Sequence, residues 1–277
     1  PAATTTVWLA INRIPLPMAS KRAATPDDIA AGVKDPIAVN YRMAYVGAVT
    51  LYDENGEPTS TIRHAHVADG GAASMEASFR RDLGVLLRRR GNLRVVTLAD
   101  GAPEMQNILD RATDGVTVTA RIVAFYHCVE HLAAGIGATG RHVPDLLADW
   151  KADLLTKDDA VEQILVHLRD WERGYAAGAI PPGLHGAVTY LENHADRLRY
   201  RAARTAGLPI GSGTVEATGK TIVQVRMKRA GARWLPTGAQ SIMGLRAAAT
   251  SSGDRWDATM ARVLKSYTKK VRVPKRP

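Results

Sequence analysis

The chain has 277 residues, 45% of them hydrophobic, and a formal net charge of +10. A chain of this length and apolar content can bury a substantial core, which excludes a disordered tail. No apolar run approaches the roughly twenty residues that a membrane span needs, and the N-terminus lacks the basic-then-apolar pattern of a signal peptide. We therefore expect a cytoplasmic protein, in keeping with its single cysteine, Cys128.

The positive charge is concentrated in two parts of the chain. It lies partly in RRDLGVLLRRR (80–90) and mostly after Arg197. A field of this sign attracts polyanions, of which nucleic acid is the commonest. A basic protein whose charges form a solvated face is the alternative.

The N-terminal part alternates predicted strands and helices. TTTVWLAINRI (4–14) is apolar and β-branched and predicts a strand, whereas the prolines of 15–40 predict a long loop. Two alternating runs predict a β-hairpin over 41–67, because Asn-Gly in the turn at 53–56 supplies a positive φ. Apolar residues at helical spacing then predict a helix over 75–89.

A strand and a helix follow at 93–112. The strand is buried in character and ends at Asp100, and a Gly-Ala-Pro turn leads into an amphipathic helix. A carboxylate just past a strand is where α/β proteins hold ligands and metals, although Asp100 can equally shape the turn or cap the helix. A further strand is predicted over 117–127 and a helix over 128–136.

The rest of the chain reads as helices. Residues 144–200 carry helical patterns only, which predicts an all-helical insertion at 141–204. The last third is predicted to be helical to about Tyr267, with a basic tail at 268–277. We expect 1–140 and 205–267 to form one α/β core around the insertion.

The stretch GSGTVEATGKT (211–221) resembles a nucleotide-binding loop but does not fit one. Such a loop needs two glycines separated by four residues before Lys-Ser/Thr, whereas Gly213 and Gly219 are separated by five. Pro209 also interrupts the buried strand that should precede the loop. The feature left to explain is Glu216, at the start of a predicted helix after a flexible Gly-Ser-Gly.

Strand, hairpin, helix and strand, with an acid after that last strand, is the order of a ribonuclease-H-like mixed sheet with flanking helices. Such a core can bring carboxylates from strand ends and a later helix around two divalent ions. Mg²⁺ prefers oxygen ligands, and an ion pair stabilises both oxygens of an in-line displacement at a phosphodiester. On this interpretation Asp100 and Glu216 are metal ligands.

Several blocks resemble one known family. The segment LPIGSGTVEATGKTIVQVRMKRAGARWLPTGAQSIMGLRAA (208–248) is similar to the C-terminal signature of bacterial insertion-sequence transposases of the ISKra4 family, a branch of the DDE transposases. The resemblance extends through YRMAYVGAVTLYDENGE (41–57), VVTLADGAPEMQNIL (95–109) and FYHCVEHL (125–132).

The resemblance implies a ribonuclease-H-like catalytic domain that cuts transposon ends and joins the 3′-hydroxyl to target DNA. It also implies a two-metal site for Mg²⁺ or Mn²⁺, double-stranded DNA as partner, a homodimer or larger assembly on DNA, and a place at the bacterial nucleoid. In the family pattern the second and third acids fall on Asp100 and Glu216.

Two acidic positions of the family pattern are not acidic here. The first acid falls on Asn12, whose amide has an aspartate's size but no charge to hold a cation pair, so we expect severely impaired cleavage. Ala124 stands where an aspartate is expected three residues before the family's histidine, His127, which we assign an auxiliary role near the metal site. The departures fit either a substitution introduced to trap a DNA complex or a natural, non-catalytic DNA-binding descendant.

Relatives carry a helical DNA-binding segment before the first strand, so we also expect this chain to be a fragment.

HCVEH (127–131) suggests a different chemistry. It fits the H-x-x-E-H pattern of inverted zinc peptidases, in which two histidines bind zinc and the glutamate is the base. A peptidase gives no reason for the charge of +10, so we prefer an interpretation in which His127 faces the acids and His131 lies on the helix surface.

Basic residues around the acids predict the DNA contacts. They are Lys220, Arg226, Lys228, Arg229 and Arg233, with Trp234 available to pack or stack, and Arg13 beside Asn12. Phosphate contacts by such side chains supply most of the affinity for DNA. A solvated helix face is the alternative for the helical residues, and a salt bridge at the strand edge is the alternative for Arg13.

Overall fold

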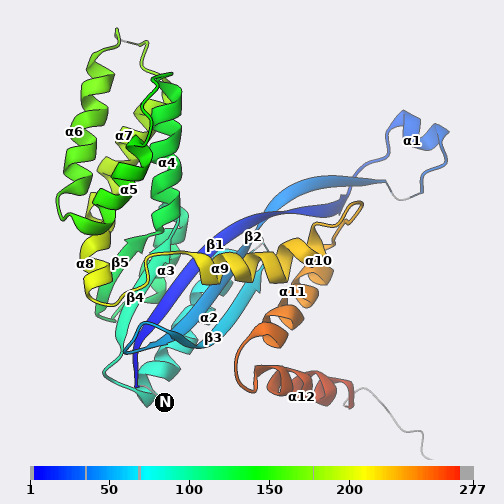
Figure 1. Cartoon of the computed structure of the whole chain (residues 1–277). Helices are drawn as coiled ribbons and strands as arrows, with labels where there is room; N and C mark the ends of the chain where they lie inside the picture. Colours follow the sequence, from blue (N-terminus) through cyan, green and yellow to red (C-terminus); the bar gives the residue numbers. More distant parts are fainter. Residues whose placement is uncertain (1–2, 35, 68–69, 177, 269–277) are drawn as a thin grey trace, which may run out of the picture.

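A five-stranded mixed sheet lies at the centre of the computed structural model, which describes residues 3–34, 36–67, 70–176 and 178–268. Its strands are β1 (Thr4–Lys21), β2 (Ile37–Asp53), β3 (Pro58–His66), β4 (Arg94–Ala99) and β5 (Val118–Val123). They lie in the order β3-β2-β1-β4-β5 (Figure 1). The hairpin strands β1, β2 and β3 are antiparallel, whereas β1, β4 and β5 are parallel. The α/β class predicted from the sequence is confirmed.

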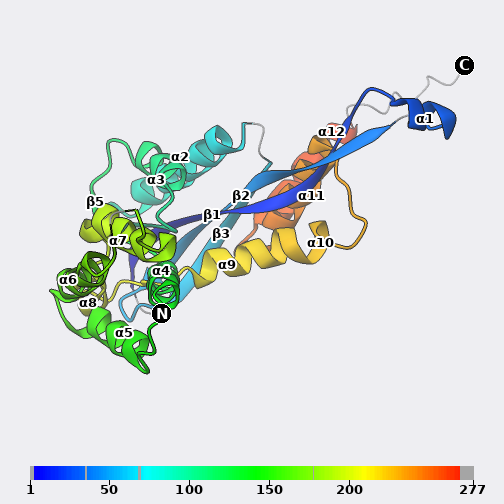
Figure 2. The same ribbon diagram turned by 90° about the horizontal axis from the view of Figure 1, so that it is seen from above.

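Helices cover both faces of this sheet (Figure 2). One face carries α2 (Gly71–Arg89) and α3 (Pro103–Ala112), and the other carries α4 (Phe125–Ala138), α9 (Gly213–Gly219) and α11 (Pro236–Thr250). β1 serves both cores because successive side chains of a strand point to opposite faces. Val7, Leu9 and Ile11 are buried with α2 and α3, whereas Trp8 and Ala10 are buried on the other side.

The first two strands extend beyond the sheet as a two-stranded ribbon that carries the short helix α1 (Pro26–Ala30) (Figures 1 and 2). The long loop predicted over 15–40 is therefore wrong at both of its ends, where β1 reaches Lys21 and pairs with β2 from Ile37, and at α1 between them.

The prolines that suggested a loop sit on the edge of β1 that faces away from β2. β1 pairs with β4 only over Thr6–Ala10 and continues past it. On the edge beyond, the carbonyl of Pro17 and the N–H of Ala19 face Trp234 instead of β2. The nitrogens of Pro15 and Pro17 point to the same edge. Proline has no N–H to donate there, which is tolerated because no neighbouring strand in the described part of the chain hydrogen-bonds to that edge at these residues.

The other predicted elements of the N-terminal part are largely confirmed. Gly56 has a φ of 78° in the β2–β3 turn, and the Asp53 carboxylate accepts the N–H groups of Asn55 and Glu57. The strand predicted over 117–127 is too long, since β5 ends at Val123 and α4 begins two residues later.

Only helices and turns occupy the described part of 144–200, as the sequence predicts. They are α5 (Leu146–Thr156), α6 (Ala160–Arg173), α7 (Pro182–His194), a 3₁₀ turn (Ala195–Arg197) and, at the end, α8 (Tyr200–Thr205). They pack on α4 at one end of the sheet (Figure 1). The contact is close, since a Cβ on Gly135 of α4 would lie 2.7 Å from the Cβ of Ala187 on α7.

The C-terminal third returns to the sheet. α9 continues through a π-helical turn (Lys220–Gln224) into α10 (Val225–Met227), and these segments form one rod beside β1 and β2 (Figure 1). α11 and α12 (Arg255–Thr268) follow. The predicted basic tail lies outside the described residues except for Thr268. No described helix is both long enough and apolar enough to cross a membrane.

Candidate active site and nucleic-acid interface

Three positions singled out in the sequence form one row across neighbouring strands. Ala10 of β1 pairs with Leu98 of β4, and Ala99 of β4 pairs with Val123 of β5. Continuing these parallel registers aligns Asn12, Asp100 and Ala124 at the same level. Because side chains alternate along a strand, Asn12 and Asp100 belong to the face that carries Trp8, Ala10 and Leu98, which is the face that α9 covers.

The helix α9 brings Glu216 to this face. Ser212, which is buried, precedes α9, and its hydroxyl donates to the Glu216 carboxylate while its carbonyl accepts the Glu216 N–H. α9 can approach β1 closely because Gly219 has no side chain: a Cβ there would lie 2.4 Å from Cδ1 of Ile14. Gly219 therefore serves the packing of α9 against β1.

Asn12 and Glu216 line one pocket of about 510 Å³ between β1 and the α9 rod. Its other lining residues are Arg13, Ile14, Pro15, Gly213, Ala217, Lys220, Gln224 and Lys228. Two of the predicted site residues thus meet there with two of the predicted DNA-binding lysines. Asp100 does not line this pocket and stands on the adjacent strand end.

The π-helical turn keeps the pocket residues on one side of the rod. Glu216, Lys220, Gln224 and Lys228 are spaced by four, and in a regular α-helix of about 3.6 residues per turn this spacing drifts steadily around the axis. The wider π turn between Lys220 and Gln224 counteracts the drift. Neither the π turn nor Gln224 was predicted from the sequence, since no residue type marks such a turn.

Arg246 of α11 satisfies a carbonyl of the π turn. Its guanidinium donates to the carbonyl oxygen of Thr221 from Nε at 3.2 Å and also from Nη2. This contact fixes the rod against α11 in the region that lines the pocket.

We expect Arg246→Met to destabilise the protein by about 1–3 kcal/mol, the usual range for a lost charge-assisted hydrogen bond. Urea unfolding measures the change in the free energy of unfolding. The matched control is Arg262→Met, because Arg262 is exposed and, among the described contacts, hydrogen-bonds only to Thr259, at 3.4 Å. An equal effect of the two substitutions would contradict a role for Arg246 in holding the π turn.

Asp100 is held by its own turn and by α7. Its carboxylate accepts the N–H of Ala102 at 2.9 Å, as in a residue that shapes a turn. Its carbonyl accepts the hydroxyl of Tyr190 at 3.1 Å. The turn-shaping role considered for Asp100 is present, and the side chain keeps its second oxygen for other ligands.

Tyr190 belongs to a stack of three rings behind this turn. The His131 ring lies 3.7 Å from the Tyr190 ring, and the His194 ring lies 4.5 Å on the other side. The ring nitrogens of buried His194 lie 2.7 Å from the carbonyl oxygen of Tyr190 and 2.8 Å from that of Gly101. Tyr190 and His194 of the helical insertion thus position the Asp100–Gly101 turn. We call these two residues the Asp100 clamp.

The predicted DNA-binding residues of the rod and the loop after it are all exposed: Lys220, Arg226, Lys228, Arg229 and Arg233. The Arg226 guanidinium lies 5.4 Å from the ring centre of Trp234, whose indole N–H donates to the carbonyl of Met227. Trp234 therefore packs within the protein. Arg13 forms a salt bridge of 2.6 Å with Glu104, the alternative considered for it.

His127 and His131 lie one turn apart on α4, as the H-x-x-E-H pattern requires. Nδ1 of His127 lies 3.2 Å from a carboxylate oxygen of Glu130, and His131 is exposed apart from its contact with Tyr190. Burial of part of its ring lowers the pKa of His131. Among the described residues, no three His, Cys, Asp or Glu side chains come together as a metal site.

Comparison of the chain with models of known protein families, with curated proteins and with solved structures found no match. The chemistry of the site therefore rests on its own residues.

Asp100 and Glu216 supply two carboxylates to the candidate site, and Asn12 supplies one amide. The amide oxygen of Asn12 accepts the N–H of Arg13 at 2.7 Å, and an amide carries no charge to bridge two cations. Asn12, Asp100 and Glu216 therefore do not fit a two-metal Mg²⁺ or Mn²⁺ site. The arrangement can bind a polyanion through its lysines, and Asn12 contributes no negative charge to hold a cation.

Proposed function

We propose that the chain is the ribonuclease-H-like domain of a DDE-type insertion-sequence transposase, with Asn12 in the first acidic position and a role in binding double-stranded DNA. One observation carries the proposal: Glu216 of a later helix lines the same pocket as Asn12 in the middle of β1, and the β1–β4 register, extended by two residues, puts Asn12 level with Asp100 at the end of β4. The strand order β3-β2-β1-β4-β5, with its antiparallel hairpin and parallel crossovers, supports this assignment.

The second candidate is a DNA-binding descendant of such an enzyme that no longer cuts DNA. Asn12 favours it, because the amide removes the charge on which metal-dependent cleavage depends. Ala124 favours it as well, since it is fully buried at the end of β5 and offers no ligand. Cleavage by the Asn12→Asp variant separates the two candidates.

A zinc peptidase is not supported by the surroundings of the H-x-x-E-H pattern. Zinc needs three protein ligands at a catalytic site, and the described residues near His127 and His131 supply no further histidine or acid in a cluster. Stoichiometric zinc in the purified protein, lost in His127→Ala, would reverse this ranking.

Lys220→Gln/Lys228→Gln tests the proposed DNA interface. Both lysines are exposed and line the pocket with Glu216. If each contacts a phosphate, the slope of log affinity against log salt concentration falls by about 1 for each lost contact, and affinity falls alike for all sequences. Anisotropy of a labelled duplex at several salt concentrations measures both quantities.

The matched control is Lys151→Gln/Lys157→Gln, which removes the same charge from α5 and the residue after it. Equal binding by the two double variants would remove the α9 rod from the DNA interface. Failure of the unmodified chain to bind any duplex would reject the proposed function as a whole. Assembly into a homodimer on DNA remains a prediction, and sedimentation with and without duplex tests it.

A further inference from the structure

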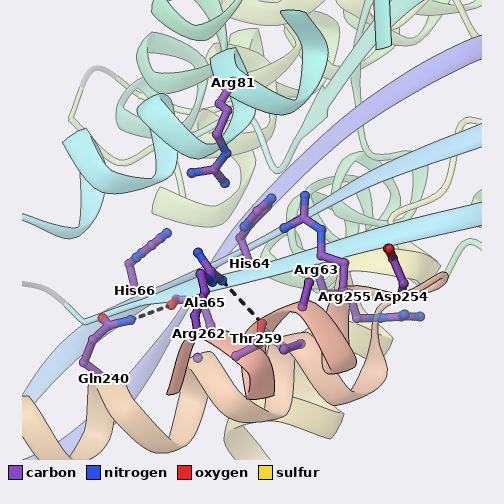
Figure 3. A pocket seen from close by; sticks show the side chains of 14 residues that line it. Arg63, His64, Ala65, His66, Arg81, Gln240, Asp254, Arg255, Thr259 and Arg262 are labelled. Atoms are coloured by element: carbon purple, nitrogen blue, oxygen red, sulfur yellow. Dashed lines mark hydrogen bonds between the residues drawn. The ribbon is translucent and has the colours of Figure 1, made fainter. Parts of the chain in front are cut away.

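A second basic pocket lies at the β3 edge of the sheet, away from Asn12 and Glu216. It has a volume of about 530 Å³ and is enclosed by β3, α2, α11 and α12. Its polar lining residues are Arg63, His64, His66, Arg81, Gln240, Asp254, Arg255, Thr259 and Arg262 (Figure 3). None of them belongs to the α9 rod or to the strand ends described above.

The backbone of β3 is already satisfied by its neighbours. The N–H groups of Thr61 and Arg63 donate to the hydroxyls of Ser252 and Ser251. Gln240 accepts the N–H of Val67 and donates to the carbonyl of Ala65. The edge is therefore not a template for an added strand, and any ligand must be recognised by side chains.

Four arginines from three elements converge on this pocket. Arg63 comes from β3, Arg81 from α2, and Arg255 and Arg262 lie seven residues apart on one face of α12. In Figure 3, Arg81 reaches from α2 towards β3, with the α12 side chains on the opposite side. The guanidinium fork matches phosphate oxygens in shape and charge.

One buried carboxylate orients part of this set. Asp82 of α2 is 5% exposed and bonds Nε2 of His64 at 2.8 Å, Nη2 of Arg255 at 2.6 Å and Nε of Arg81 at 3.2 Å. Each of these arginines keeps further N–H groups, since a guanidinium carries five. The pocket is therefore preorganised, because a carboxylate behind it fixes two of its cations.

The charge of the pocket is positive after these pairs are counted. The pocket region holds four guanidinium groups and two carboxylates, those of Asp82 and Asp254. Two positive charges are therefore in excess. The histidines add little near neutral pH, because burial lowers the pKa of His64 and lowers that of His66 to about 4.

The lining also indicates which kind of anion fits. Pockets for small organic ligands are lined mainly by apolar and aromatic side chains. Apart from the two histidines, the described lining here offers only Ala and Gly beside its polar groups: Ala65, Gly244, Ala247, Ala248 and Ala258. Such a surface suits phosphate groups more than a base or another ring.

We propose that this pocket binds phosphate groups of a nucleic-acid backbone, as a second contact separate from the Asn12–Glu216 pocket. The choice of nucleic acid over free phosphate rests on the proposed function. The two pockets lie on different elements, so the chain would contact nucleic acid at two places.

Arg81→Gln/Arg262→Gln tests the proposal in the full chain. Both side chains are exposed, and among the described contacts each makes one hydrogen bond to another side chain, 3.2 Å to Asp82 for Arg81 and 3.4 Å to Thr259 for Arg262, so the fold should persist. Anisotropy of a labelled duplex should show a roughly tenfold loss of affinity and a salt slope lower by about 1 for each lost contact. Arg81→Lys/Arg262→Lys should keep the slope because it keeps the charge.

Arg173→Gln is the control, since Arg173 is exposed on α6 and paired only with Asp170 among the described contacts. A double Gln variant that binds duplex as tightly as Arg173→Gln overturns the proposal. A thermal shift by pyrophosphate that the double Gln variant loses, with duplex binding unchanged, also overturns it in favour of a free phosphate.

The experiment gives different results if the proposed function itself is wrong. If neither the unmodified chain nor Arg173→Gln binds duplex, the transposase assignment fails, and the pyrophosphate shift alone decides the pocket. A shift that requires Arg81 and Arg262 then supports its phosphate chemistry, and no shift overturns it.

Discussion

Asn12→Asp should enable the chain to nick a duplex in the presence of Mg²⁺ or Mn²⁺, a reaction that we expect to be severely impaired with Asn12 in place. The substitution adds the missing charge beside Asp100, on the face to which α9 brings Glu216. A metal pair contributes several kcal/mol to such a displacement, which corresponds to about 10²-fold or more in rate. Conversion of a supercoiled plasmid or a transposon-end duplex, followed with and without metal, measures the change.

Two further substitutions in the Asn12→Asp background test the assignment of the other acids. Asp100→Asn and Glu216→Gln should each return the rate to that of the unmodified chain. Cleavage that survives Glu216→Gln would remove this residue from the site. If Asn12→Asp binds duplex but does not cut it under any metal, the non-catalytic candidate is preferred.

Gly101→Ala should destabilise the protein and disturb the turn that carries Asp100. Gly101 has a φ of 95°, and a Cβ there would lie 2.8 Å from Nε2 of His194 and 3.2 Å from the Tyr190 ring. The left-handed backbone costs about 1–2 kcal/mol and the crowding about 1–3 kcal/mol more, so we expect about 2–5 kcal/mol in all. Urea unfolding measures the loss.

Gly140→Ala is the matched control for this loss. Gly140 also has a positive φ, 65°, but a Cβ there would meet no atom within 4 Å. Gly140→Ala should cost only about 1–2 kcal/mol, the effect of the left-handed backbone alone. If the two substitutions cost the same, the close packing of the Asp100 clamp contributes nothing to stability.

The sequence predicted the local elements well where residue pattern and neighbours agree. The β2–β3 hairpin follows from an Asn-Gly turn between alternating strands, and α2 follows from apolar residues at helical spacing. Asp100 was predicted at the end of β4 because a short apolar run stops there. Each of these features depends on residues close together in the chain.

The errors arose where distant segments decide the structure. Pro15 and Pro17 suggested a loop, yet β1 continues because its proline edge faces Trp234, more than two hundred residues later. The π turn could not be predicted locally, because Arg246 of α11, 25 residues later, donates to the Thr221 carbonyl of that turn. The clamp of Tyr190 and His194 on the Asp100 turn likewise joins segments some ninety residues apart.

By itself the sequence determined the class of the fold, the order of most elements and the residues Asn12, Asp100 and Glu216 as candidates, because turn chemistry, periodicity and charge are local properties. Only the tertiary structure decided that Asn12 and Glu216 share a pocket, that Arg13 pairs with Glu104, and that four arginines converge at the β3 edge. These juxtapositions depend on strand register and on helices returning from far along the chain, which no local pattern encodes.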